Sequence, residues 1–203
     1  YRWRFLILFI MNRLLIKQAV FLHLVYFGFI FLAGFFADNY SHLGQHASEL
    51  GINTNKAASF LFKTGVILTS LSLFALSLGL RLMFGKRFTL FPILVFLFGV
   101  TFIFGALFPI GSPWHGLYGL GLFIMITPYV FLYELKDLSQ NKTLHVLSII
   151  AGLLMFLYLW SMVAGLDPMD FRGLTQRLFG VVVFGWFSLI SFFLDSISER
   201  NLN

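Results

Sequence analysis

Six long apolar runs constrain this chain more than any other feature of its sequence. Each run is long enough for a helix to cross a hydrocarbon core of ~30 Å, which takes ~20 residues. The runs show no alternation of polar and apolar residues, and open strands would leave backbone groups unpaired in lipid. They lie near residues 18–37, 57–83, 88–108, 114–133, 143–165 and 173–195. The sequence therefore predicts an all-α membrane protein, a six-transmembrane-helix bundle.

The composition supports the same class of protein. Hydrophobic residues make up 59% of the 203 residues and charged residues only 11%, which is more apolar surface than a water-soluble domain of this length can bury. The net charge of +6 would suggest nucleic-acid binding in a soluble protein. Here the basic residues lie in short loops between apolar runs, so we expect no nucleic-acid partner. The chain has no cysteine, which excludes thiolate chemistry.

The positions of Lys and Arg predict the orientation of the bundle. Most of the 14 basic residues precede span one, join spans two and three, join spans four and five, or follow span six. Because cytoplasmic loops are enriched in Lys and Arg, we expect both termini in the cytoplasm. Residues 1–17 are interpreted as a basic and apolar N-terminal segment, and residues 18–203 as a single transmembrane domain. Pro128 is expected to kink the fourth helix.

The first extracytoplasmic loop carries histidines at a spacing that suits a metal ion. Residues 41–51 begin with Ser and end with Gly, which predicts a short amphipathic helix between an N-cap and a C-terminal stop. On such a helix His42, His46 and Glu49 share one face. Imidazole and carboxylate groups at this spacing bind Zn²⁺. We nevertheless expect histidines that only cap, hydrogen-bond or face water, with no cofactor. The alternative is a zinc site, with His115 as a third imidazole, whose predicted ligands are His42, His46 and His115.

Two further outer segments contribute polar residues. His115 begins span four, and Arg177 lies about one turn inside span six. An arginine at that depth is costly unless it is paired, so it marks either a functional site or a structural ion pair. Lys63, about two turns into span two, adds positive charge to the same mouth or extends toward water. The sequence thus predicts an extracytoplasmic polar pocket whose ligand-binding residues are Glu49, His115, Arg172, Gln176 and Arg177.

Several short motifs resemble those of a known family. The motifs are Ser48-Glu49-Leu50-Gly51 after the first span, Phe108-Pro109 before His115, and Gly173-Leu174 before Arg177. In this order, over most of residues 18–195, the chain resembles the bacterial and archaeal multi-pass membrane family called domain of unknown function 998. The resemblance implies a six-helix bundle in a bacterial cytoplasmic (inner) membrane, with no established activity. Many members carry an Asp shortly after Phe-Pro, where this chain has residues 110–112, Ile-Gly-Ser.

Three functions are open on the sequence alone. The first is a non-catalytic pocket that binds an anionic lipid headgroup or small molecule, with membrane lipids as partners. The second is an accessory subunit that packs against other membrane protein subunits in a larger complex. The third is a metal-dependent membrane lipid hydrolase that uses the predicted zinc site. No nucleotide-binding or nucleophile-elbow motif points to another class of enzyme.

Overall fold

The computed structural model describes residues 2–200, and every regular element in that range is a helix. The long helices are α1 (Arg2–Lys17), α2 (Leu22–Phe36), α3 (Lys56–Phe84), α4 (Leu90–Leu107), α5 (Thr127–Leu135), α6 (Lys142–Val163) and α7 (Arg172–Arg200). The 3₁₀ helices are η1 (Gln18–Phe21), η2 (Ala47–Ile52), η3 (Gly85–Arg87), η4 (Leu117–Ile126) and η5 (Met169–Phe171).

Six stretches of these helices are long and apolar enough to span a membrane. They are Ile7–Phe36, Lys56–Arg87, Leu90–Leu107, Leu117–Leu135, Lys142–Val163 and Met169–Ser198. This confirms the predicted six-helix membrane bundle. The first span begins at Ile7 rather than at residue 18, because α1, η1 and α2 follow one another without a loop. Residues 7–17 thus form part of the apolar stretch of the first span.

Aromatic side chains fill the centre of the bundle, and apolar side chains also cover its outside. Phe88, Phe131 and Phe187 are fully buried, and the rings of Phe88 and Phe131 stack with centroids 6.0 Å apart. On the outer faces Phe35 is 83% exposed and Trp160 is 61% exposed. Large apolar side chains over so much of a surface require a non-aqueous surrounding. The packing therefore agrees with a core enclosed by helices and an exterior covered by lipid.

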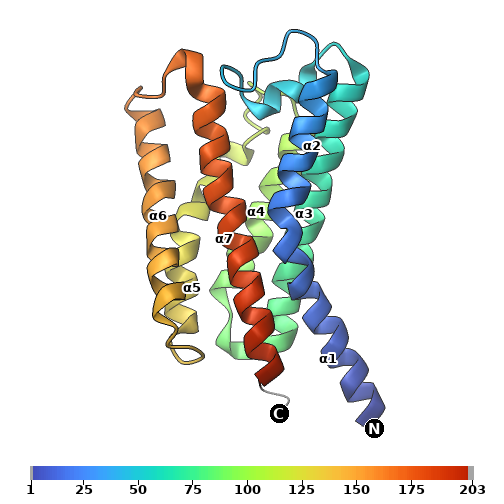
Figure 1. Ribbon diagram of the computed structural model, residues 1–203, viewed down its shortest axis with the longest axis vertical. Coiled ribbons are helices and arrows are strands. Elements are labelled where there is room, and N and C mark those ends of the chain that lie inside the picture. The colour runs from blue at the N-terminus through green and yellow to red at the C-terminus, as the bar shows by residue number, and fades with distance from the viewer. Residues whose placement is uncertain (1, 201–203) are drawn as a thin grey trace.

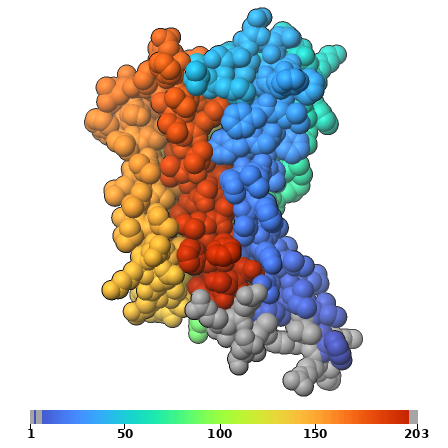
Figure 2. Space-filling view, viewed as in Figure 1, coloured from blue at the N-terminus to red at the C-terminus, as the bar shows by residue number. Residues whose placement is uncertain are grey.

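The start of α1 and the end of α7 lie at the same end of the bundle (Figure 1). Near that end Arg13 pairs with Asp195 at 2.5 Å, which joins α1 to α7. We call the opposite end the distal end; its loops are residues 37–55, 108–116 and 164–171. Figure 2 shows the first of these loops over the top of the bundle, in contact with the start of α7. That the distal end faces away from the cytoplasm stays a prediction.

The fourth span is not one continuous helix. The backbone is left-handed at Leu117, Tyr118 and Gly119, with φ of 46°, 52° and 84°, and regular α-helix begins only at Thr127. Pro128 lies in the first turn of α5, where a proline needs no N–H partner. The predicted kink at Pro128 is therefore wrong, since the irregular segment precedes it. Irregular backbone at membrane depth is tolerated where protein or a cavity surrounds it.

The first distal loop contains a short helix, as predicted, but this helix begins and ends at other residues than expected. η2 covers only Ala47–Ile52, and Ser41 caps a turn before it rather than a helix. The N-cap is His46, whose backbone N–H donates to Oε1 of Glu49 at 2.9 Å. His42 therefore does not share a helix face with His46 and Glu49, because it lies in the turn before η2.

Caps from polar side chains explain where three spans begin. Asn55 accepts a hydrogen bond from a backbone N–H in the first turn of α3, and Asn141 does the same for α6. The start of α4 is capped from another helix: the Glu134 carboxylate on α5 accepts from the backbone N–H groups of residues 89, 90 and 91 at 3.0, 2.7 and 3.0 Å. These N–H groups have no partner within their own helix.

Candidate functional site

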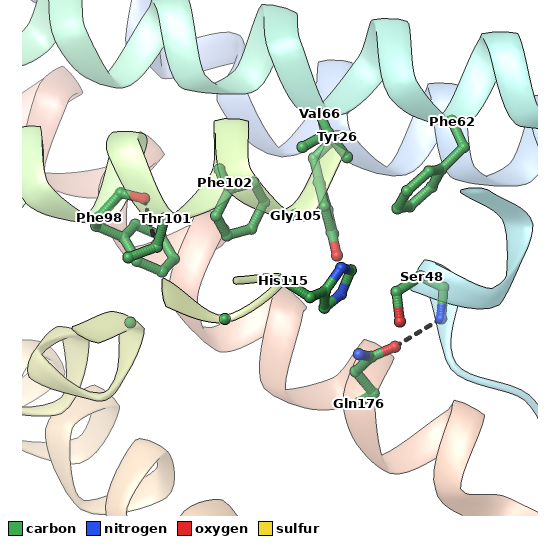
Figure 3. Close-up of a pocket in the computed structure, with 13 residues that line it drawn as sticks. Tyr26, Ser48, Phe62, Val66, Phe98, Thr101, Phe102, Gly105, His115 and Gln176 are labelled. Carbon is green, nitrogen blue, oxygen red and sulfur yellow. Dashed lines mark hydrogen bonds between the residues drawn. The ribbon is translucent and has the colours of Figure 1, made fainter. Parts of the chain in front are cut away.

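A cavity of about 230 Å³ lies at the distal end of the bundle. We call it the polar cavity, because Tyr26 from α2, Ser48 from η2, His115 from the loop before η4 and Gln176 from α7 all line it (Figure 3). The remaining wall is largely aromatic and aliphatic, with Phe102 as one of its rings. A few converging polar groups in an apolar pocket are typical of small-molecule sites.

The imidazole of His115 is held by the backbone at the end of α4. Its Nδ1 lies 2.8 Å from the carbonyl oxygen of Phe108. A carbonyl oxygen only accepts hydrogen bonds, so Nδ1 carries the proton and a neutral ring has its lone pair on Nε2. Within residues 2–200, Nε2 has no hydrogen-bond partner. Because His115 lines the polar cavity, this nitrogen is available to a ligand.

The amide of Gln176 is oriented in a similar way. Its Oε1 accepts a hydrogen bond from the backbone N–H of Ala47 at 2.7 Å. That bond fixes which end of the amide is the donor, so the NH₂ group is left to the cavity that Gln176 lines (Figure 3). Gln176 therefore ties η2 to α7 and at the same time offers two N–H donors to a ligand.

A second cavity of about 340 Å³ lies next to the polar cavity. We call it the apolar cavity: Leu159 and Met162 of α6 and Phe179 and Val183 of α7 form one side of it. The two cavities share wall residues, which are Tyr26, Phe98, Phe102, Gly116, Gly121 and Gln176. The site is thus polar toward the distal end and apolar toward the middle of the membrane.

The broken fourth span forms part of the wall of both cavities. Gly116 and Gly121 line each of them. A Cβ atom at Gly116 would meet nothing within 4 Å, and one at Gly121 would have the side chain of Thr101 as its nearest neighbour, at 3.5 Å, an ordinary van der Waals contact. These glycines therefore leave space rather than allow two helices to touch. The irregular backbone of η4 lies beside a cavity, where such backbone is tolerated in a membrane protein.

Arg177 does not line either cavity. It binds the first distal loop instead. The residue is only 8% exposed. Its guanidinium donates to the carbonyl oxygen of Gln45 at 3.1 Å, to Nδ1 of His42 at 3.1 Å and to the hydroxyl of Tyr40. It also donates to the carbonyl oxygen of Gly173 at 2.6 Å, while its Nε is buried without a partner among the described residues. Arg177 thus holds the loop on α7 through neutral acceptors.

Glu49 and Arg172 form a second connection between the loop and α7. Oε1 of Glu49 lies 3.5 Å from Nη2 of Arg172, and its Oε2 accepts from the Gln45 amide at 3.1 Å. Arg172 also donates from Nε to the carbonyl oxygen of Gly44 at 3.1 Å. Of the five predicted ligand-binding residues, the structure places His115 and Gln176 on the cavity wall. It places Glu49, Arg172 and Arg177 in the contacts that hold the loop.

Burial changes the ionisation of the two groups that face Arg177 from the loop. Desolvation raises the pKa of Tyr40 above its ordinary value, although the charge of Arg177 acts in the opposite direction. Desolvation lowers the pKa of His42, and the charge of Arg177 lowers it further. Both groups are therefore neutral near pH 7, and His42 accepts a hydrogen bond at Nδ1.

The structure does not bring the predicted zinc ligands together. His42 faces Arg177, His46 caps η2, and His115 lies in the polar cavity. Across the described part of the chain, no three His, Asp or Glu side chains form a group that could hold a metal ion. These side chains would share one face only on a continuous helix through residues 42–49, and that helix does not form.

Several residues of the cavity wall were not identified from the sequence as site residues, among them the polar residues Tyr26, Ser48 and Thr101. Tyr26 lies within an apolar run that contains many aromatic residues, so nothing in its neighbourhood distinguishes it. Ser48 belongs to the Ser-Glu-Leu-Gly motif after the first span, and that motif was the available signal. Its position in η2 places it at the cavity.

The family comparison agrees with this architecture. The family described as "Protein of unknown function (DUF998)" matches residues 22–192, a range that includes half of the first span, the whole of the next four and most of the sixth. Searches of curated proteins and of solved structures found no match to the chain. The chain therefore belongs to the DUF998 family and is an integral membrane protein.

Proposed function

We propose that the protein binds a lipid-like amphiphile, with the headgroup in the polar cavity and the apolar chain in the apolar cavity. The observation that carries the proposal is the shared wall: Tyr26, Phe102 and Gln176 line both cavities. One ligand with a polar and an apolar part matches such a site. In the predicted orientation the headgroup lies at the level of the outer leaflet, so membrane lipids are the proposed partners.

The sizes of the cavities support a ligand of this kind. They measure about 230 and 340 Å³, and joined they fall in the range of ~300–1,000 Å³ that small-molecule sites occupy. The apolar part is lined by Phe98, Ile124 and Phe184 among others, and such side chains favour contact with hydrocarbon over water. An aqueous solute would leave this part of the site without a suitable partner.

The position of α6 supports access from the bilayer. Met162 lines the apolar cavity and is itself 45% exposed. Leu159, one turn earlier on α6, lines the same cavity. The acyl chain of a lipid that moves laterally out of the bilayer past α6 would reach the apolar cavity without crossing water.

The test compares two substitutions of the same kind on α6. Leu159→Trp fills the apolar cavity, whereas Leu157→Trp adds the same ring at a position that is 59% exposed to the surroundings. The full chain is extracted gently in mild detergent, and bound lipid is counted by native mass spectrometry. We expect retained lipid in the wild type and in Leu157→Trp, and a loss of at least about tenfold, ~1.4 kcal/mol, in Leu159→Trp. Equal retention in all three proteins would rule out this site.

A further inference from the structure

Lys63 lies within the span that α3 forms, and it is exposed at the surface of the bundle near the polar cavity. It is about two helical turns, ~10 Å, from the start of α3 at Lys56. It lines a small cavity of about 70 Å³ whose wall also includes Ser48 and Gly105. These two residues line the polar cavity as well, so the small cavity that Lys63 lines is separated from the polar cavity by a shared wall.

No acidic group balances this charge. Neither the small cavity nor the polar cavity has an Asp or Glu in its wall, and no ion pair of Lys63 is found among residues 2–200. Glu49 is engaged by Arg172 and by the backbone of the loop. A cation at this depth is costly unless it reaches water or an anion. An anionic ligand in the cavity would supply the missing partner.

The neutral groups in the cavity also favour an acceptor-rich ligand. Gln176 presents its NH₂ group, because Ala47 occupies its oxygen. Ser48 and Tyr26 each add a hydroxyl to the wall of the polar cavity. Hydroxyl and amide donors together with an ammonium group suit the several oxygen acceptors of a phosphate.

We infer that the ligand of this site carries a phosphate that no cationic group of its own neutralises, so that its headgroup has a net negative charge, and that Lys63 determines this selectivity. The inference rests on the proposed function, because it names the headgroup of the proposed amphiphile. A phosphate-bearing lipid and a dissolved phosphate ester share this chemistry. The joined apolar cavity favours the lipid.

The experiment offers the full chain, freed of endogenous lipid, equal amounts of phosphatidylglycerol and phosphatidylcholine in detergent. Native mass spectrometry then measures the ratio of the two lipids bound. Lys63→Gln removes the charge, Lys63→Arg keeps it, and Lys56→Gln removes the same charge from the start of the same helix, away from the cavity wall. A parallel sample adds glycerol 3-phosphate as a soluble competitor.

We expect the wild type, Lys63→Arg and Lys56→Gln to favour phosphatidylglycerol by about fivefold, the effect of ~1 kcal/mol from one basic residue. Lys63→Gln should bind the two lipids about equally. Displacement of the lipid by glycerol 3-phosphate would identify a soluble phosphate ester as the ligand, and its absence would identify the lipid.

Equal binding of both lipids by the wild type would overturn the inference and leave the proposed lipid site intact. A preference that survives in Lys63→Gln would exclude Lys63 as its cause. A lower melting temperature in Lys63→Gln with unchanged selectivity would show that Lys63 stabilises the packing of α3 against the nearby end of α4 and does not select the lipid. Absence of any bound lipid would refute the proposed function itself.

Discussion

The side-chain oxygen of Gln176 accepts a hydrogen bond from the backbone N–H of Ala47 at 2.7 Å, and this bond joins α7 to η2 across 129 positions of the chain. This one bond places the end of the loop and turns the Gln176 NH₂ group toward the cavity. The substitution Gln176→Glu separates the two roles, because it keeps an acceptor for Ala47 and replaces the donors with a carboxylate. We expect the melting temperature to change little and the retention of phosphatidylglycerol to fall about tenfold, ~1.4 kcal/mol.

The control for this prediction is Gln176→Leu, which removes the acceptor as well as the donors. It should lower both the melting temperature and the lipid retention, since the N–H of Ala47 then loses its partner. Tryptophan fluorescence during heating reports the first quantity, and native mass spectrometry reports the second. Undiminished retention in Gln176→Glu would show that the NH₂ group does not contact the ligand.

Arg177 and Arg172 provide a matched pair of arginines on one helix. Arg177 is 8% exposed, and it bonds to several acceptors at once, which the single ammonium of a lysine does not reproduce. We expect Arg177→Lys to lower the free energy of unfolding by ~2–4 kcal/mol. The side chain of Arg172 is 38% exposed, so Arg172→Lys should cost at most ~1 kcal/mol. Thermal unfolding of both variants in the same detergent measures the difference, and equal losses would contradict the prediction.

Gly173 allows the loop backbone to approach α7. A Cβ atom there would lie 2.3 Å from the carbonyl oxygen of Gln45 and 2.7 Å from that of His42, and backbone atoms do not move aside easily. We expect Gly173→Ala to destabilise the protein by more than ~2 kcal/mol and to make residues 37–55 more sensitive to protease. At Gly185 a Cβ atom would meet nothing within 4 Å. The same change there should stabilise α7 by up to ~1 kcal/mol.

His42 should make the stability of the distal loop depend on pH. Its pKa in the folded protein lies below the ordinary value of 6.5, through burial and then through the charge of Arg177. Below pH 6.5 the unfolded state therefore binds more protons than the folded state, so stability is complete above that pH and is lost as the pH falls. Arg177 and the neutral Tyr40 are the groups that face the ring.

Melting temperatures between pH 5 and pH 8 test this sign. The wild type should lose stability toward pH 5, and His42→Gln should show a smaller loss. His145→Gln, a matched change at the other end of the bundle, should keep the slope of the wild type. A slope that His42→Gln leaves unchanged would assign the pH dependence to another group.

Glu134 should be important for the stability of the other end of the bundle. Its carboxylate accepts from three N–H groups at the start of α4. Removal of this cap by Glu134→Ala should cost ~1–3 kcal/mol. Asp137→Ala removes an exposed carboxylate from the adjoining loop and should change the free energy of unfolding by less than ~0.5 kcal/mol. Thermal unfolding compares the two, and similar losses would show that the cap contributes nothing specific.

Whether the predicted residues bind a ligand stays a prediction, but where the structure places each of them has a physical explanation. His115 and Gln176 were expected at a distal pocket and do line a cavity. Arg177 was recognised as an unusual buried cation, but spacing does not tell whether such a group meets a ligand or a backbone carbonyl. In the structure it satisfies carbonyl oxygens of the loop. Tyr26 carries no signal in the sequence, because one aromatic residue in an apolar run resembles the next.

The sequence by itself determined the six spans, because the length and apolarity of a transmembrane helix are local properties that the bilayer imposes. It also determined which end of the bundle carries most of the Lys and Arg residues. Only the tertiary structure decided where the fourth span breaks, where η2 begins and which polar groups meet in one cavity. Those features depend on contacts between segments far apart in the chain, such as Ala47 with Gln176, and on irregular backbone that is stable only beside its neighbours.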